Sequence, residues 1–162
     1  MFEFWKFYKK LLNGEIYFDE FPQERLLRFK KETLSLLKEN VKNEDQEGLE
    51  TTLSVLFYDG ADADYTDILL QLLDEKWHTS EEDIISVLEL IKDPKSVDKL
   101  YEVALDVPDY DDMRAIAKKS IWALSAVNTP EAIQKLKLLE KVDDPIIKEN
   151  ATFQLEEVLK KH

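Results

Sequence analysis

The sequence marks the start of a helix in the same way at recurring positions. Residues 93–100 read DPKSVDKL, and residues 129–136, which lie 36 positions later, read TPEAIQKL. In both stretches Asp or Thr precedes a proline, and Asp144-Pro145 is a third such pair. Proline suits the first helical position, where its missing N–H costs nothing, and Asp or Thr before it accepts hydrogen bonds from the free N–H groups of the first turn. The chain therefore predicts helices that begin at these prolines.

Between residues 80 and 162 the apolar residues recur every three or four positions, which is the period of amphipathic helices. The pattern forms five successive segments with short breaks, so neighbouring helices are expected to run antiparallel. Only three glycines and five prolines occur in 162 residues, which argues against a loop-rich or all-β fold. The apolar stripes are Ile84, Val87, Leu88 and Ile91; Val97, Leu100, Tyr101, Ala104 and Leu105; Ile116, Ser120, Ala123 and Val127, widened by Ile121 and Leu124; Ile133, Leu136 and Leu139; and Ile147, Ala151, Leu155, Val158 and Leu159.

Upstream of residue 80 the pattern is less regular. Helices are expected at 2–12, 24–41, 49–58 and 65–73, with an irregular segment at 14–22 and a turn at 59–64. Residues 1–47 are interpreted as an N-terminal cap, because the terminal units of repeat proteins must close the core. The alternative is a partner-binding or membrane-surface arm built on five aromatic residues. These residues fall on nearly all sides of a helix, which favours burial; they are Phe2, Phe4, Trp5, Phe7 and Tyr8.

Two segments in the second half of the chain resemble a known repeat. Residues 114–124 (RAIAKKSIWAL) followed by 128–133 (NTPEAI) look like a HEAT repeat of the short variety shared with phycobilisome-lyase-like proteins. Residues 143–148 match the usual entry into the next repeat, and Asn128-Thr129 stands where the family commonly has Gly-Asp. The resemblance covers about 80–162, and helix pairs also align at offsets of 36 and 34 positions.

This resemblance implies an all-α fold, a right-handed α-solenoid of HEAT-like antiparallel helix pairs with an atypical N-terminal cap. We expect one domain over residues 1–162, in which residues 1–47 form the helical cap and residues 48–162 form the HEAT-like repeats. About four helix pairs fit this length. A fold of this kind hosts many functions, so the function must be argued from individual residues.

The negative charge of the chain is unevenly distributed. The formal net charge is −13, and residues 48–112 hold 18 acidic residues against four basic ones, whereas both flanking regions are nearly neutral. Such a region repels phosphate backbones and anionic lipids and attracts cationic partners. The sequence therefore predicts no nucleic-acid partner and no membrane partner, and it favours a basic protein. The alternative is that the acidity serves solubility alone.

Residues for catalysis or metal binding are scarce. The chain has no cysteine and two histidines, of which His78 is expected to be a surface or capping residue. An EF-hand loop beginning at Asp62 would need Gly at position 67 and Glu at position 73, where the chain has Asp67 and Leu73. We expect no catalytic residue, no metal and no cofactor. The cysteine-free composition and a charged N-terminus without a cleavage site or membrane span favour a cytoplasmic protein.

Three predicted loops carry carboxylates, and two of them also carry a large aromatic side chain. They follow residue 73, residue 105 and residue 142, and in a solenoid they would line the same edge. They are interpreted either as helix caps and solvated turns or as a docking surface for a basic protein, in which aromatics anchor and charges steer. The candidate partner-binding residues are Asp74, Glu75, Trp77, Glu81, Glu82, Asp106, Asp109, Tyr110, Asp111, Asp112, Asp143 and Asp144.

These features predict a protein-binding module that is not an enzyme. HEAT-like proteins recur among immunity proteins. The resemblance therefore implies an inhibitor that uses an acidic surface to cover a basic toxin, and a nuclease is the expected kind of toxin. One alternative is a general HEAT-repeat adaptor or assembly protein in a bacterial or phage complex, which would share the fold and differ in its partner. The other is a lyase-like enzyme, which would require a pocket lined by a few polar residues.

Overall fold

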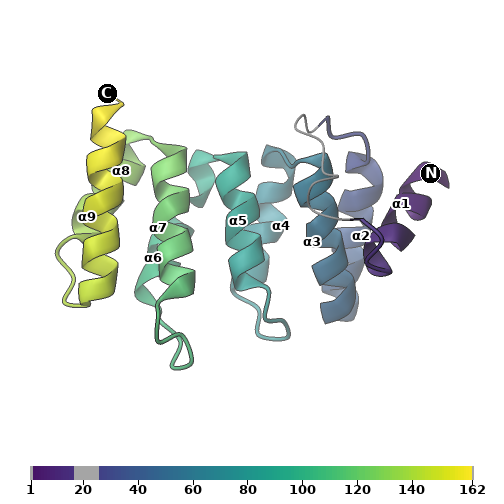
Figure 1. The fold of residues 1–162 in the computed structure, drawn as a ribbon, viewed down its shortest axis with the longest axis horizontal. Coiled ribbons are helices and arrows are strands. Elements are labelled where there is room, and N and C mark those ends of the chain that lie inside the picture. The colour runs from purple at the N-terminus through teal and green to yellow at the C-terminus, as the bar shows by residue number, and fades with distance from the viewer. Residues whose placement is uncertain (1, 17–25, 162) are drawn as a thin grey trace. The chain divides into compact units, whose positions relative to one another are not determined.

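The computed structural model describes residues 2–16 and 26–161. Among these residues every regular element is a helix, which confirms the all-α prediction (Figure 1). None of the described helices is long and apolar enough to cross a membrane. The helices are α1 (Phe2–Leu12), α2 (Lys30–Asn43), α3 (Gln46–Asp59), α4 (Thr66–Leu73), α5 (Glu81–Ile91), α6 (Val97–Leu105), α7 (Ala115–Val127), α8 (Pro130–Leu139) and α9 (Pro145–Lys160), with 3-10 turns η2 (Ala63–Tyr65) and η3 (Pro94–Ser96).

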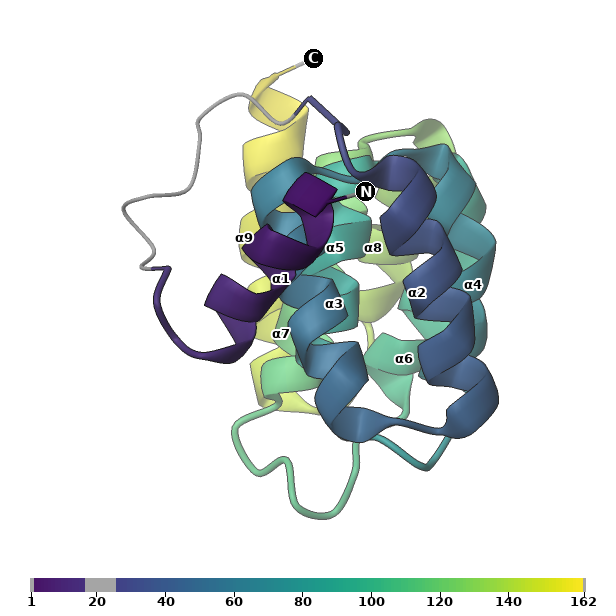
Figure 2. The same ribbon diagram turned by 90° about the vertical axis from the view of Figure 1, so that its right-hand side faces the viewer.

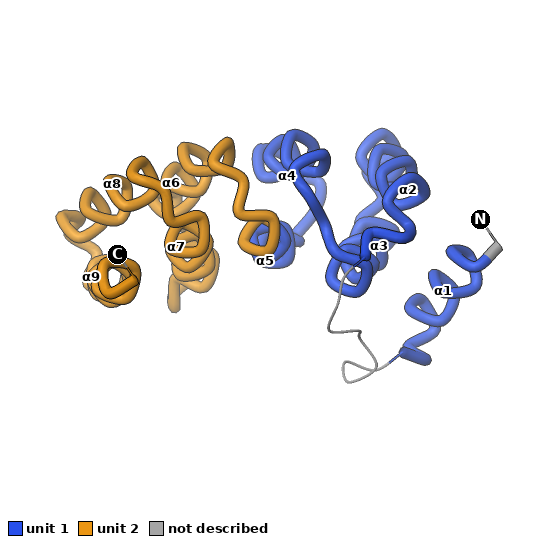
Figure 3. Tube along the Cα trace, turned by 90° about the horizontal axis from the view of Figure 1, so that it is seen from above, with its two compact units in different colours: residues 1–87 blue, residues 88–162 orange. Residues whose placement is uncertain are grey.

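The contacts between Cα atoms divide the chain into two compact units. Unit 1 comprises residues 1–87 and unit 2 comprises residues 88–162 (Figure 3). The division falls inside α5, whereas the sequence placed its boundary between cap and repeats after residue 47. The single-domain organisation stays a prediction.

In unit 2 the helices form two layers. Figures 1 and 3 show α7 and α9 side by side, with α6 and α8 in the layer behind them. The apolar stripes face inward, because the side chains of Leu100, Ile121, Leu124 and Leu136 have no exposed surface. Two stripe residues are instead exposed: Leu105 by 44% and Leu159 by 49%, and each lies in the last turn of its helix.

The three predicted cap residues all accept hydrogen bonds from backbone N–H groups. Asp93 accepts from Lys95 at 3.0 Å, and Thr129 Oγ1 accepts from Ala132 at 3.2 Å. Asp144 Oδ1 accepts from the N–H groups of residues 146 and 147 at 3.0 and 3.3 Å. These bonds confirm the helix starts read from the cap-proline pairs, with one difference. After Asp93 the chain first makes the 3-10 turn η3, and α6 begins three residues later than Pro94.

In unit 1 the N-terminal helix α1 lies against α3 (Figure 2). Its aromatic residues contact aromatic residues of later segments: the ring centroids of Phe7 and Tyr58 are 4.2 Å apart, and those of Phe7 and Phe29 are 5.5 Å apart. Phe4 is fully buried, as the sequence suggested, but Trp5 on the same helix is 47% exposed. These ring contacts attach α1 to the remainder of unit 1.

The helix expected at 24–41 begins at Lys30, and residues 24 and 25 lie outside the described residues. Leu27 has a positive φ of 55° and donates its N–H to the carbonyl oxygen of Asp59 at 2.9 Å. The buried Asp59 carboxylate accepts from the N–H groups of Arg28 and Phe29, both at 2.8 Å. The backbone before Lys30 is therefore bound to the end of α3 and cannot continue a helix, which periodicity alone does not reveal.

Replacing Asp59 by Ala should lower the free energy of unfolding by about 2–4 kcal/mol, because two N–H groups lose a charged acceptor. Asp62→Ala is the matched control, since Asp62 is partly exposed, and its ion pair with Lys30 and its hydrogen bond from the N–H of Asp64 are screened by solvent and should contribute clearly less. Urea unfolding of both variants measures the difference. Equal effects would show that the buried carboxylate does not hold the start of α2.

Candidate functional site

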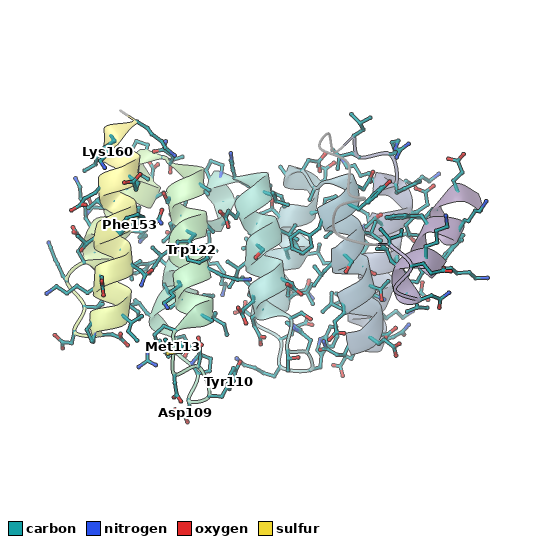
Figure 4. All side chains as sticks on the ribbon, viewed as in Figure 1. Asp109, Tyr110, Met113, Trp122, Phe153 and Lys160 are labelled. Atoms are coloured by element: carbon teal, nitrogen blue, oxygen red, sulfur yellow. The ribbon has the colours of Figure 1, made fainter. Side chains whose placement is uncertain are left out.

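Of the three loops predicted to bind a partner, the loop between α6 and α7, residues 106–114, has the most exposed acidic and large apolar side chains. We refer to it as the α6–α7 loop. Tyr110 is 73% exposed and Met113 is 66% exposed. The carboxylates of Asp106, Asp109 and Asp112 are exposed beside them. Figure 4 labels Asp109, Tyr110 and Met113, which lie together at one end of unit 2, beyond the start of α7.

Asp111, in the same loop, has a different role from its neighbours. Its side chain is 8% exposed, and its two carboxylate oxygens accept from the N–H groups of Ala115 at 2.8 Å and Ile116 at 3.1 Å. These are two of the free backbone donors in the first turn of α7. Asp111 is therefore a helix cap, and its carboxylate is not presented to a partner.

Arg114 holds the end of the loop in place. Its Nη1 atom donates to the carbonyl oxygens of Asp111 and Asp112, both at 2.9 Å, and its Nε atom donates to Asp144 Oδ2 at 2.7 Å. The backbone of Arg114 has a φ of 57°, which is uncommon for a residue with a side chain. The guanidinium thus joins the α6–α7 loop to the start of α9. We call this set of hydrogen bonds the Arg114 clamp.

The Arg114 clamp also changes the electrostatics of its two charged members. The hydrogen bond from Arg114 holds the pKa of the Asp144 carboxyl below its ordinary value, and the N–H groups of Ile147 and Ile146 act in the same direction. The hydrogen bond to Asp144 raises the pKa of Arg114 in turn. Both groups are therefore charged at neutral pH, and the clamp remains formed there.

The loop before α9 contains two of the predicted site residues. Asp143 is exposed, whereas Asp144 is half-buried and is occupied by the N-terminus of α9 and by Arg114. Through Arg114 the structure therefore links Asp111 and Asp112 to Asp144 in unit 2. Among the predicted residues of these two loops Asp106, Asp109, Tyr110, Asp112 and Asp143 are the exposed members.

The predicted residues of unit 1 lie in the segment from the end of α4 to the first turn of α5. Asp74 and Glu82 are exposed, and Glu81 is half-buried. Glu75 accepts hydrogen bonds from the Trp77 indole and from Gln71 Nε2. Trp77 is half-buried and packs edge-on against His78, with ring centroids 5.0 Å apart. Trp77 is thus held within unit 1 by its own loop and is less exposed than Tyr110.

His78 is buried, contrary to the expectation of a surface residue. Its Nε2 atom lies 2.7 Å from the carbonyl oxygen of Leu72, and its Nδ1 atom accepts from the N–H of Ser80 at 3.0 Å. This pattern requires the neutral ring with the proton on Nε2. The histidine joins the end of α4 to the start of α5, which agrees with the capping alternative.

The carboxylates of the acidic turn at residues 59–64 likewise bind other groups of the protein. Asp59 binds backbone amides, and Asp62 and Asp64 form ion pairs with Lys30. Within residues 2–16 and 26–161 no group of three or more His, Cys, Asp or Glu side chains has the arrangement of a metal site. These acidic residues stabilise the fold of unit 1.

Sequence reasoning did not identify Arg114 as the residue that holds the α6–α7 loop, nor the exposure of Met113. In the sequence Arg114 is only one residue of the repeat-like stretch, because a contact 30 positions away has no local signal. Trp122 and Phe153 are also exposed, by 40% and 57%. A signal for these two did exist, since both lie off the apolar stripes of their helices.

Comparisons of this chain with models of protein families, with curated proteins and with solved structures found no match. The candidate site is therefore argued from its geometry. Exposed aromatic and thioether groups with neighbouring carboxylates, on a loop that is held at its base, suit the binding of another macromolecule.

Substitution should destabilise the fold at Asp111 and leave its stability almost unchanged at Asp109. Asp111→Ala removes the cap of α7 and should lower the free energy of unfolding by about 1–2 kcal/mol. Asp109→Ala changes an exposed side chain and should stay within about 0.5 kcal/mol of the unsubstituted protein. Thermal or urea unfolding measures both. A large loss for Asp109→Ala, or none for Asp111→Ala, would contradict this division of roles.

Proposed function

We propose that this chain is a protein-binding module, an immunity-type inhibitor that neutralises a basic toxin by covering it with an acidic surface centred on the α6–α7 loop. A nuclease is the expected kind of toxin, because its active site must be basic to bind phosphates. The proposal is carried by one observation: Tyr110 and Met113 are exposed beside Asp109 and Asp112 on a loop that Arg114 holds at its base.

The proposed architecture is a right-handed solenoid of HEAT-like helix pairs with an atypical N-terminal cap. It is supported by the cap residues that recur at Asp93, Thr129 and Asp144, each bonded to the first turn of the element that follows. The two layers of unit 2 also suit such a stack. The solenoid matters for function because successive loops would then add to one continuous binding edge.

The exposed aromatic and apolar groups of the loop contribute to binding in a different way from its exposed carboxylates. Large flexible or aromatic side chains supply most of the binding free energy when a partner covers them, and Tyr110 and Met113 are of this kind. Exposed carboxylates add little affinity individually, but they accelerate encounter with a cationic partner and reject anionic ones. Because the Arg114 clamp already orders the loop, a partner would not have to spend binding energy on ordering it.

The test uses tagged protein to capture the partner from its native host at low and at high salt, followed by affinity measurement with the purified partner. Tyr110→Ala should raise Kd by about tenfold or more. Asp109→Lys with Asp112→Lys should raise Kd at low salt, mainly through a slower association rate. Asp111 is left intact, because its loss would also uncap α7.

The matched control is Glu39→Lys with Glu131→Lys, which changes the net charge equally at exposed positions outside the loop. The proposal requires a basic partner, a selective effect of the loop variants, and rescue of growth when the partner is co-expressed with the intact chain. If both double variants weaken binding equally, only net charge matters and the loop is not the site. Partners that are neutral and salt-independent would favour the adaptor alternative.

A further inference from the structure

A second exposed surface lies on unit 2, separate from the α6–α7 loop. It consists of the sides of α7 and α9 that face away from α6 and α8, and Figure 4 labels one aromatic residue on each helix. Trp122 on α7 is 40% exposed and Phe153 on α9 is 57% exposed. We call this surface the α7/α9 face. Two large aromatic side chains on adjacent helices are the usual anchors of a protein interface.

The charged residues nearest to the two aromatics differ between the helices, whereas Lys160 at the end of α9 is paired with Glu157 at 3.1 Å. Lys118 lies one turn before Trp122, and α7 contains no acidic residue. Glu149 lies one turn before Phe153, and Glu156 lies one turn after it. Lys118, Glu149 and Glu156 form no ion pair with other described residues. The face therefore carries an unpaired positive charge on one helix and unpaired negative charges on the other.

The two helices also match in direction and height. Both run upward in Figure 1 from starts at the same end of unit 2. Trp122 is the eighth residue of α7 and Phe153 is the ninth residue of α9. A two-fold axis parallel to these helices preserves height and exchanges their places. In a dimer with this axis Trp122 would lie over Phe153 of the second copy, and Lys118 would lie opposite its Glu149.

We infer that the α7/α9 face binds a second copy of this chain, so that the protein forms a two-fold symmetric dimer. Because the axis exchanges α7 and α9, Lys118 of each copy lies opposite Glu149 of the other, and the same ion pair forms twice. Few unrelated partners would match both helices in this way. The face also belongs to residues 113–162, whose nine basic and seven acidic residues avoid the strong self-repulsion of residues 48–112. Ser125 and Ala126, one turn after Trp122, leave room for Glu156 of the second copy.

The size of the face determines how strong this dimer is. A helix of 13 residues is about 20 Å long, and each of the two helices contributes a strip about 10 Å wide, so the face covers roughly 400 Å² per copy. The total of roughly 800 Å² is below that of stable complexes, and we expect Kd on the order of 10–100 µM. The dimer is therefore concentration-dependent.

The test is sedimentation velocity of the full chain from about 5 to about 500 µM, a range that brackets the expected Kd. Trp122→Ala should raise Kd about tenfold or more. Trp5→Ala is the matched control, since Trp5 is similarly exposed on α1 in the other unit and should leave Kd unchanged. Tyr110→Ala should also leave Kd unchanged, which separates this dimer from the proposed inhibitor function.

The charge pair allows a second, sharper test. Lys118→Glu alone and Glu149→Lys alone should each raise Kd, and the two substitutions together should return it toward the original value. A chain that stays monomeric at the highest concentration overturns the inference. So does a dimer that is insensitive to Trp122→Ala, or single charge variants whose effects add without recovery. Circular dichroism melting of each variant verifies that the fold is intact.

Discussion

The backbone N–H groups at the start of each helix need acceptors, and the carboxylates of this chain supply many of them. Asp45, Asp93, Asp111 and Asp144 each accept from the first turn of the element that follows. Asp59 does the same for residues just before α2. An all-helical chain with short connections has many such donors, and leaving them buried without a partner costs about 1–3 kcal/mol each.

This constraint divides the acidic residues into two groups with different roles. Asp59, Asp93 and Asp111 are bonded to backbone amides, so they contribute to the net charge of residues 48–112 without being available for specific contacts. Asp109 and Asp112 lie in the same region and remain exposed. The same loop thus contains Asp111, which caps α7, and residues that face solvent. The Arg114 clamp bonds the backbone of both kinds of residue, at Asp111 and Asp112.

The sequence predicts most of the fold because its signals are local. The Asp-Pro and Thr-Pro pairs identify the starts of α8 and α9 to the residue, and the start of α6 to within the 3-10 turn η3. The start of α2 was misplaced because it depends on Asp59, about 30 positions away. The sequence identified Tyr110, Asp109 and Asp111 alike as candidates, because it does not show which carboxylate of the loop is buried against the first turn of α7. Arg114 was missed for the same reason as the start of α2, since its partner Asp144 lies 30 positions away.

The central claim is that the Arg114 clamp holds the α6–α7 loop in one conformation with Tyr110 and Met113 exposed. Backbone ¹⁵N relaxation tests it most directly, by comparing the order parameters of residues 109–113 in the original chain and in Arg114→Ala. Order parameters of about 0.8 are expected in the original chain, as in a rigid backbone, and values below about 0.6 once the guanidinium is removed. Values below about 0.6 in the original chain, or no change in Arg114→Ala, would contradict it.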